Sequence, residues 1–223
     1  MSAQPKEETA EGISGNRRRL FSGQSRETLL KVGLGEHDKR KSWPPRKDFE
    51  VEAFFTHPGY NPTDIHPDGD LVLIKLSQEV DLATFTPACL TSRSFSDFTG
   101  QMALVYGWGR EESGQYPSVL KEVGVRVVDQ ETCKEAMFPT SITDKMLCAG
   151  GVEGEDSCAG DSGGPLTIKV GDQHILIGET SFGRGCGRRG TYGVYGRISS
   201  FREFIERKME KPKFCKGLDS ASS

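Results

Sequence analysis

The 223-residue chain lacks the features that mark several large protein classes. No apolar run approaches the roughly 18 residues of a membrane-spanning helix, and the formal charge of −3 shows no excess of basic residues. The one arginine run, Arg17–Arg19, is too short to predict a nucleic-acid surface. The first twelve residues are polar and acidic, whereas a signal peptide has a basic start and then an apolar core. We therefore expect no membrane span, no nucleic-acid binding and, in the chain as written, no export signal.

The two ends of the chain are also poor in apolar side chains. Residues 1–28 cannot bury enough surface to offset the entropy of ordering them, so a flexible segment is expected there. Residues 211–223 form a polar tail that we expect to be disordered. The sequence therefore predicts one folded domain over residues 29–210.

Short apolar runs separated by Gly, Pro, Asn and Asp fill the middle of the chain. They predict β-strands at Leu30–Gly35, Phe49–Phe55, Leu71–Leu76, Met102–Trp108, Lys121–Val128, Gly164–Val170, His174–Phe182 and Gly193–Ile198. Short strands at this spacing are typical of an antiparallel barrel or sandwich. One amphipathic helix is predicted around Phe201–Met209, begun by a capping box of Ser200 and Glu203.

One decapeptide carries the strongest functional signal. Residues 156–165 read DSCAGDSGGP, which resembles the nucleophile loop of the trypsin/chymotrypsin family of serine endopeptidases. Other segments resemble family motifs in the family's order: LGEHD at 34–38, HPGYN at 57–61, DLVLIKL at 70–76, GWG at 107–109, ITDKMLCAG at 142–150, SFG at 181–183 and GVY at 193–195. The resemblance implies an all-β fold of two antiparallel β-barrels followed by a C-terminal α-helix. Because it begins only near Leu30, the first barrel is expected to be incomplete.

The resemblance also implies catalytic roles. Ser162 would be the nucleophile, Asp70 would orient a histidine, and backbone N–H groups of Gly160 and Ser162 would form the oxyanion hole. In the family, cleavage before an Ile-Val-Gly-Gly sequence creates an ammonium group that pairs with the residue matching Asp161. Ile13 begins only a faint echo of that sequence.

The expected specificity pocket is typical of enzymes that cleave after Arg or Lys. Asp156 lies six residues before the nucleophile, where the family places the floor of this pocket. Ser157 and Ser181 match other pocket residues, and Gly183 and Gly193 match wall glycines that leave room for a long side chain. A carboxylate there would pair with a basic side chain of a protein or peptide, because a buried charge without a partner is costly.

The general base is missing from its expected position. The family carries it in an Ala-Ala-His-Cys block well upstream of the aspartate, and here that region, residues 22–25, reads SGQS. The chain has four histidines, His37, His57, His66 and His174, and none matches the family position. Of these, His57 falls in an expected surface turn and His66 approaches the aspartate with nothing to orient it. Serine is a poor nucleophile without a base, so the chain as written is expected to be inactive.

Six cysteines fit a disulfide framework. The resemblance implies the pairs Cys133–Cys148 and Cys158–Cys186, which leaves Cys89 and Cys215. Cys89 matches a family cysteine that tethers an upstream segment or light chain, and a pairing of Cys89 with Cys215 is the alternative. Such disulfide usage predicts an oxidising, extracellular destination for the full-length parent.

Three functional hypotheses follow from the sequence. The first is a secreted trypsin-like endopeptidase of which this chain lacks the front. The second is a non-catalytic homologue whose pocket binds a basic segment of a partner, and the third is an incompletely folded product with exposed sheet edges. No cofactor is implied. Glu36 and Asp38 match a loop that binds calcium in some relatives, but the basic run Lys39–Lys41 follows, so we predict no metal site.

Overall fold

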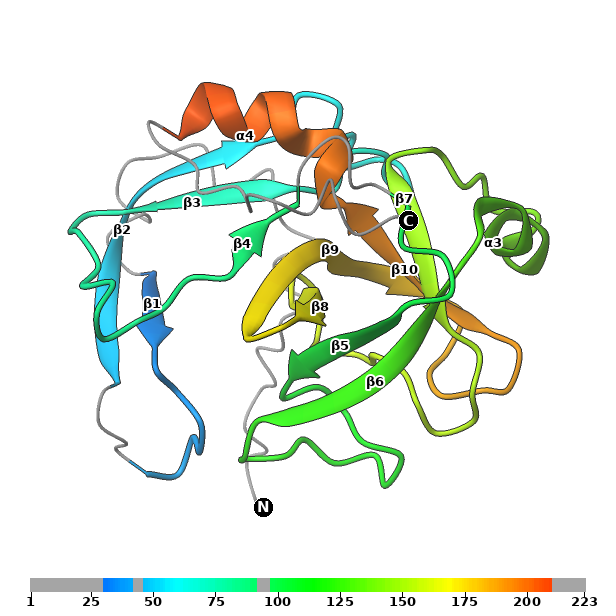
Figure 1. Cartoon of the computed structure of the whole chain (residues 1–223), viewed down its shortest axis with the longest axis horizontal. Coiled ribbons are helices and arrows are strands. Elements are labelled where there is room, and N and C mark those ends of the chain that lie inside the picture. The colour runs from blue at the N-terminus through cyan, green and yellow to red at the C-terminus, as the bar shows by residue number, and fades with distance from the viewer. Residues whose placement is uncertain (1–29, 42–45, 92–96, 210–223) are drawn as a thin grey trace, which may run out of the picture.

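The strands of the protein form two groups, each built from neighbouring parts of the chain (Figure 1). The computed structural model describes residues 30–41, 46–91 and 97–209. The predicted N-terminal segment, 1–28, and the predicted tail, 211–223, lie outside the described residues. The described strands form one three-stranded sheet and one seven-stranded sheet.

The larger sheet closes into a barrel. Its members are β5 (Met102–Gly107), β6 (Lys121–Val128), β7 (Met146–Gly150), β8 (Pro165–Val170), β9 (Gln173–Gly183) and β10 (Tyr192–Arg197). They follow the order β10-β7-β6-β5-β8-β9, and β9 pairs back to β10, so six antiparallel strands complete the ring. A short strand, β4 (Cys89–Leu90), pairs with β9 in parallel.

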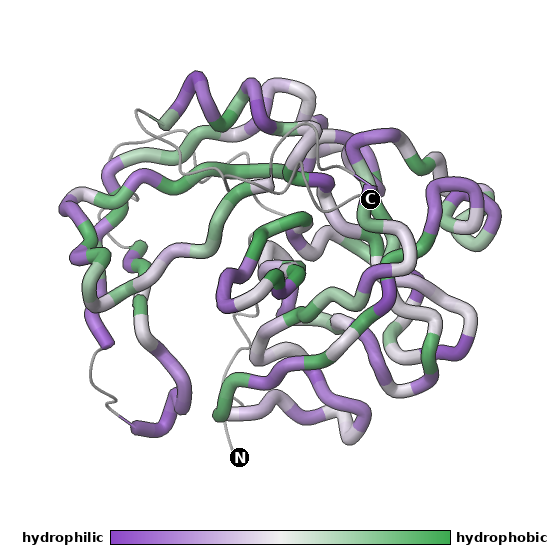
Figure 2. The backbone as a smooth tube through the Cα atoms, viewed as in Figure 1, coloured by the Kyte–Doolittle hydropathy of each residue, from purple (hydrophilic) through white to green (hydrophobic). Residues whose placement is uncertain are grey.

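Alternation along the strands fills the barrel. In β5, Ala103 and Val105 are buried, and in β6, Val125 and Val127 are buried, because residues two apart point to the same side of a strand. They share one apolar core with residues of β7 to β10, including the fully buried Tyr195. Figure 2 shows hydrophobic residues along these strands and hydrophilic residues in many of the connecting loops.

The smaller sheet is formed by the N-terminal strands of the described chain and is called the front sheet below. It consists of β1 (Lys31–Leu34), β2 (Lys47–Thr56) and β3 (Val72–Leu76), in the antiparallel order β1-β2-β3. This sheet, together with the closed barrel and the C-terminal helix, confirms the predicted trypsin-like double-barrel fold class; the first sheet has three strands in the described part of the chain. All eight predicted strands overlap strands of the structure, within a few residues at their ends.

The C-terminal helix joins the two halves. A 3₁₀ turn, η2 (Ile198–Phe201), leads into α4 (Arg202–Lys208), which lies across β2 and β3 in Figure 1. Buried residues of both pack on Leu71, beside β3, in one apolar cluster that also contacts β9. The predicted capping box is wrong, because η2 places Ser200 inside a helical turn. Its Oγ donates to Asp144 O at 3.1 Å instead of capping α4.

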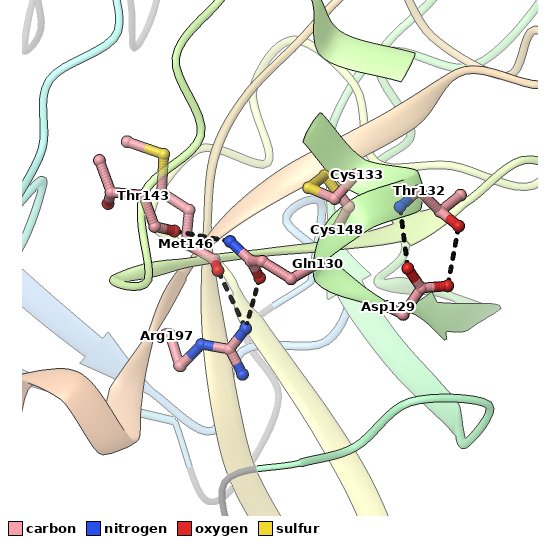
Figure 3. The surroundings of a disulfide bond; sticks show 8 residues. All are labelled: Asp129, Gln130, Thr132, Cys133, Thr143, Met146, Cys148 and Arg197. Atoms are coloured by element: carbon pink, nitrogen blue, oxygen red, sulfur yellow. Dashed lines mark hydrogen bonds between the residues drawn. A yellow bond between two sulfur atoms is a disulfide. The ribbon is translucent and has the colours of Figure 1, made fainter. Parts of the chain in front are cut away.

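Among the described residues, the sequence prediction missed helix α3 (Gln130–Met137). The carboxylate of Asp129 caps it, accepting from Thr132 N at 2.8 Å and Thr132 Oγ1 at 2.7 Å. Figure 3 shows how Cys133 of this helix pairs with Cys148 of β7. The cap and the disulfide explain how so short a helix holds its place.

A polar bridge links α3 to the following loop and to β10. Gln130 Nε2 donates to Thr143 O at 2.8 Å, and Gln130 Oε1 accepts from Arg197 Nη2 at 2.9 Å. The same Nη2 donates to Met146 O at 3.0 Å (Figure 3). The segment around Thr143 is therefore fixed from two sides.

The apolar cluster under α4 is a testable source of stability. Replacing the buried Phe204 by Ala should lower the free energy of unfolding in urea by about 3 to 5 kcal/mol, because a large side chain leaves a cavity. Glu206→Ala on the exposed side of α4 is the matched control and should cost less than about 1 kcal/mol. Equal losses in both variants would contradict this role of the cluster.

Candidate active site

Ser162 lies at an exposed position on a tight loop between Cys158 and β8. Backbone hydrogen bonds fix the loop: Asp161 N donates to Cys158 O at 3.0 Å, and Gly163 N donates to Thr180 O at 2.7 Å. Gly160 has a φ of +98°, in the left-handed region that favours glycine. Within the described part of the chain, the N–H groups of Gly160 and Ser162 make no hydrogen bond to protein. Both are therefore available to an external acceptor.

Asp161, whose counterpart in the family pairs with an ammonium group, accepts hydrogen bonds from backbone amides in this structure. Its Oδ1 accepts from Gly109 N at 2.7 Å, and its Oδ2 accepts from Cys158 N at 3.0 Å. The carboxylate occupies the space where Gly107 and Gly109 would carry side chains. A carboxylate needs only well-placed donors, and these backbone amides supply two of them.

Asp70 lies directly before β3 and reaches the second barrel. Its Oδ2 accepts a hydrogen bond from Ser181 Oγ, on β9, at 2.9 Å. The structure thus brings together the predicted aspartate and one predicted pocket serine, 111 residues apart in the chain. Asp70 is half-buried.

All four histidines of the chain lie in its described part, and none of them hydrogen-bonds to Ser162. His37 O accepts from Leu120 N at 2.7 Å, on the loop before β6. His174 lies on the β8–β9 hairpin, and its Nδ1 is 3.4 Å from the Tyr106 hydroxyl.

His66 is placed by an aromatic contact. Its ring stacks on that of Phe182, with centroids 4.3 Å apart and an interplanar angle of 27°. Its Nδ1 is buried and has no hydrogen-bond partner among the described residues. Burial, and secondarily the charge of Arg184, lowers the pKa of His66 below its ordinary value. Sequence spacing gave no sign of this stacking.

Asp156 is a largely buried carboxylate held by backbone amides. Its Oδ1 accepts from Ser157 N at 2.8 Å, and its Oδ2 accepts from Gly187 N at 3.0 Å. Burial raises its pKa above the ordinary 3.8, although the two amide hydrogen bonds act in the opposite direction. The hydroxyls of Ser157 and Tyr195 lie 3.1 Å apart behind it. No described cation forms an ion pair with Asp156.

Two glycines keep the surroundings of Asp156 open. A side chain on Gly193 would begin 3.1 Å from Asp156 Oδ1 and 3.0 Å from the Tyr195 hydroxyl, so it would crowd the carboxylate. Gly183 of β9 is paired with Gly193 of β10 in the antiparallel ladder, so the two glycines lie side by side. Glycine at position 193 therefore leaves the space beside the carboxylate that a side chain would take.

Both disulfides implied by the resemblance are present. Cys133–Cys148 attaches α3, and Cys158–Cys186 ties the Ser162 loop to the segment after β9. Cys89 is buried, forms no disulfide within the described residues, and its Sγ lies 3.8 Å from Gln173 Oε1. The alternative partner, Cys215, lies outside the described residues.

A polar cavity adjoins the back of the Ser162 loop. Its lining includes Asp156, Asp161, Gly109 and Arg188, but not Ser162 or any residue of β3. The carboxylates of Asp156 and Asp161 therefore line one cavity, whose lining includes neither Ser162 nor the glycines at 183 and 193.

Charged side chains of the loop after β1 form ion pairs with one another. Asp38 accepts from Arg40 Nε at 2.9 Å, and this hydrogen bond lowers the Asp38 pKa to about 2. Arg46 Nε lies 3.1 Å from Glu36 Oε2.

In the described ranges, no group of three acidic, histidine or cysteine side chains is arranged to hold a metal. Each helix in these ranges also falls short of the length and hydrophobicity that crossing a membrane demands.

Comparison with known proteins agrees with this geometry. The family model described as Trypsin matches residues 21–205, most of the chain. The chain belongs to the trypsin family. Its trypsin-family relatives include mannan-binding lectin serine protease 1 of Mus musculus, 37% identical over 184 residues, which are 80% of this chain and 26% of the relative.

Two further relatives differ in what their names say of activity. Suppressor of tumorigenicity 14 protein homolog of Bos taurus is 36% identical over 181 residues, covering 79% of this chain and 21% of the relative. Inactive CLIP domain-containing serine protease A3 of Aedes aegypti is 35% identical over 190 residues, covering 79% of this chain and 39% of the relative. The chain therefore spans less than half the length of these relatives, and one of the three is named as inactive.

The raised pKa of Asp156 predicts how ligand binding depends on pH. Benzamidine, an aromatic amidinium, should bind through the ionised carboxylate, so its affinity should fall as the pH drops toward a midpoint above 3.8. Calorimetric titration across this range measures the midpoint. Asp156→Asn should abolish binding at every pH, whereas Asp172→Asn on the β8–β9 turn should leave it unchanged. Equal binding by the Asp156 variant would contradict the assignment.

Proposed function

We propose that residues 29–210 form a trypsin-like serine peptidase domain that recognises Arg or Lys side chains of proteins or peptides. In this proposal Ser162 is the nucleophile, Asp70 orients a base, and the N–H groups of Gly160 and Ser162 stabilise the oxyanion. Asp156 binds the basic side chain, and Ser157, Ser181, Gly183 and Gly193 shape the pocket. No cofactor takes part in this chemistry.

The observation that carries the specificity is the setting of Asp156. Its carboxylate is largely buried and held by two amides, and glycine keeps the space before it open. A carboxylate in such a setting gains most from a ligand that brings its own positive charge, because the charge replaces lost hydration. Arg and Lys are the side chains with that charge and sufficient reach.

We infer further that the chain of 223 residues does not turn over substrate. Ser162 has no histidine at hydrogen-bonding distance, so no base removes its proton during attack. Loss of the histidine in a comparable triad enzyme costs roughly a millionfold in turnover. The orienting carboxylate alone does not replace the base.

A second candidate function follows from the same observations. A pocket without a base still binds, so the domain would act as a non-catalytic module that holds a basic segment of a partner through Asp156. The relative named as an inactive serine protease supports this possibility. In either case the disulfides suit an extracellular parent, and Cys89 would serve as a tether to another segment.

Labelling and hydrolysis test the proposal directly. Purified chain should not cleave an arginyl chromogenic peptide above the rate in buffer, and a fluorophosphonate should not label Ser162 above the level of Ser162→Ala. The same preparation should bind benzamidine through Asp156. Ser162-dependent labelling would refute the inactivity, whereas loss of benzamidine binding with a folded protein would refute the pocket assignment.

A further inference from the structure

His57 lies beside the segment that carries Asp70, away from Ser162. It follows β2 directly, and its backbone N donates to Leu71 O at 2.9 Å. On the other side of Asp70, Leu71 N donates to Gly69 O at 2.8 Å, so Asp70 is the central residue of a three-residue turn. The backbone of His57 therefore anchors one end of the turn that presents Asp70.

The ring of His57 supports the same turn. Gly59 N donates to His57 Nδ1 at 3.1 Å, which requires that this nitrogen carry no proton. A side chain on Gly69 would begin 2.7 Å from His57 Nδ1 and 3.1 Å from Gly59 C. The ring and the turn at residues 57–60 are thus packed directly against the residue before Asp70.

Aromatic residues of the C-terminal segment fix the ring from its other side. Its centroid lies 5.1 Å from the ring of Phe201 and 5.1 Å from that of Phe204, with edge-to-face angles of 66° and 76°. Both phenylalanines are buried. The ring is therefore held between this apolar cluster and the Asp70 turn, although Pro58 and Gly59 are exposed as expected of a surface turn.

The charged neighbours of His57 come from three other segments. Lys145 precedes β7, Arg207 lies on α4, and Asp68 lies in the loop before the Asp70 turn. Asp68 is already engaged, because its carboxylate accepts from Lys145 Nζ at 2.6 Å and from Thr143 Oγ1 at 2.7 Å. Arg207 pairs weakly with Glu203, at 3.8 Å. Two cations thus face the ring against one carboxylate that already has partners.

We infer that neutral His57 is a positioning residue for Asp70, and that its protonation loosens the Asp70 turn and its contact with Ser181. A proton on Nδ1 would oppose the N–H of Gly59, remove the only acceptor for it in the ring, and place a cation beside Lys145 and Arg207. The ring cannot move away without leaving its contacts with Phe201 and Phe204. The turn would therefore lose its support at acidic pH.

The direction of titration agrees with this geometry. Burial first, and then the charges of Lys145 and Arg207, lower the pKa of His57 below its ordinary 6.5. A lowered folded-state pKa means that the neutral form is favoured by folding, so the support is complete above pH 6.5 and is lost as the pH falls toward the lowered value. The inference concerns the position of Asp70, so it holds whether or not the proposed peptidase function is correct.

Amide hydrogen exchange of Leu71, followed by NMR, measures the state of this turn. Spectra would be compared at about pH 7.5 and about pH 4.5, on either side of the ordinary imidazole pKa of ~6.5, after correction for intrinsic exchange rates. In the wild-type chain, protection of Leu71 should fall by about tenfold or more at the lower pH. Amides of β6 and β7 in the second barrel should keep their protection.

Two substitutions separate the hydrogen bond from the charge. His57→Asn keeps an acceptor for the N–H two residues on, as in an Asx-turn, but cannot be protonated, so Leu71 should stay protected at both pH values. His57→Ala has no acceptor and should leave Leu71 poorly protected at both. His174→Asn, a histidine far from the turn, should keep the wild-type pH response.

The other outcomes overturn the inference. Unchanged wild-type protection at low pH would show that His57 does not control the turn. An acid response in His57→Asn as large as that of the wild type would assign the response to another group, such as Asp68. Full protection in His57→Ala at neutral pH would show that the ring is dispensable, and loss of protection throughout the second barrel would show global unfolding instead.

Discussion

The hydrogen bond from Ser181 to Asp70 is the contact on which the candidate site depends. It joins a side chain at the end of the front sheet to a strand of the closed barrel, at 2.9 Å. Neither half of the molecule contains the site by itself, because Ser162 and Asp156 belong to the barrel whereas Asp70 enters from beside β3. The surrounding contacts, including Asp68 with Lys145 and Thr143, keep the two halves in register. Geometry at this junction, more than the stability of either sheet, determines whether the acid and the serine face the same space.

Much of the fold could be predicted from the sequence because its signals are local or strongly patterned. In β5 and β6 of the closed barrel, buried residues alternate with less buried ones, so these strands were recognisable from residues such as Val125 and Val127. Strand β7 is buried at every position and was not predicted. The two disulfides and the loop around Ser162 followed from motif resemblance. Helix α3 was missed although Asp129 is a good N-cap residue, because a helix of two turns has too few residues to show a periodic pattern.

Contacts between distant segments were beyond the sequence. Nothing near His66 predicts that its ring stacks on Phe182, and nothing near His57 predicts its place between α4 and the Asp70 turn. The amide partners of Asp161 were missed for a related reason. The family resemblance draws attention to an ammonium partner, whereas the structure supplies two backbone donors: Gly109 N of the GWG loop, 52 residues away in the chain, and the nearby Cys158 N. Every residue except proline carries a backbone N–H, so the identity of a side chain does not show which backbone amide will donate to the carboxylate.

The position of α4 has a consequence for how the molecule is made. Apolar residues near the C-terminal end of the described chain, among them Phe201 and Phe204, cover Leu71 beside β3 in the front sheet. A growing polypeptide exposes the front sheet to solvent throughout synthesis of the barrel, and its apolar surface is covered only after the last helix has left the ribosome. The order of translation therefore delays the covering of the front sheet, and with it the joining of the two halves, until α4 has been synthesised.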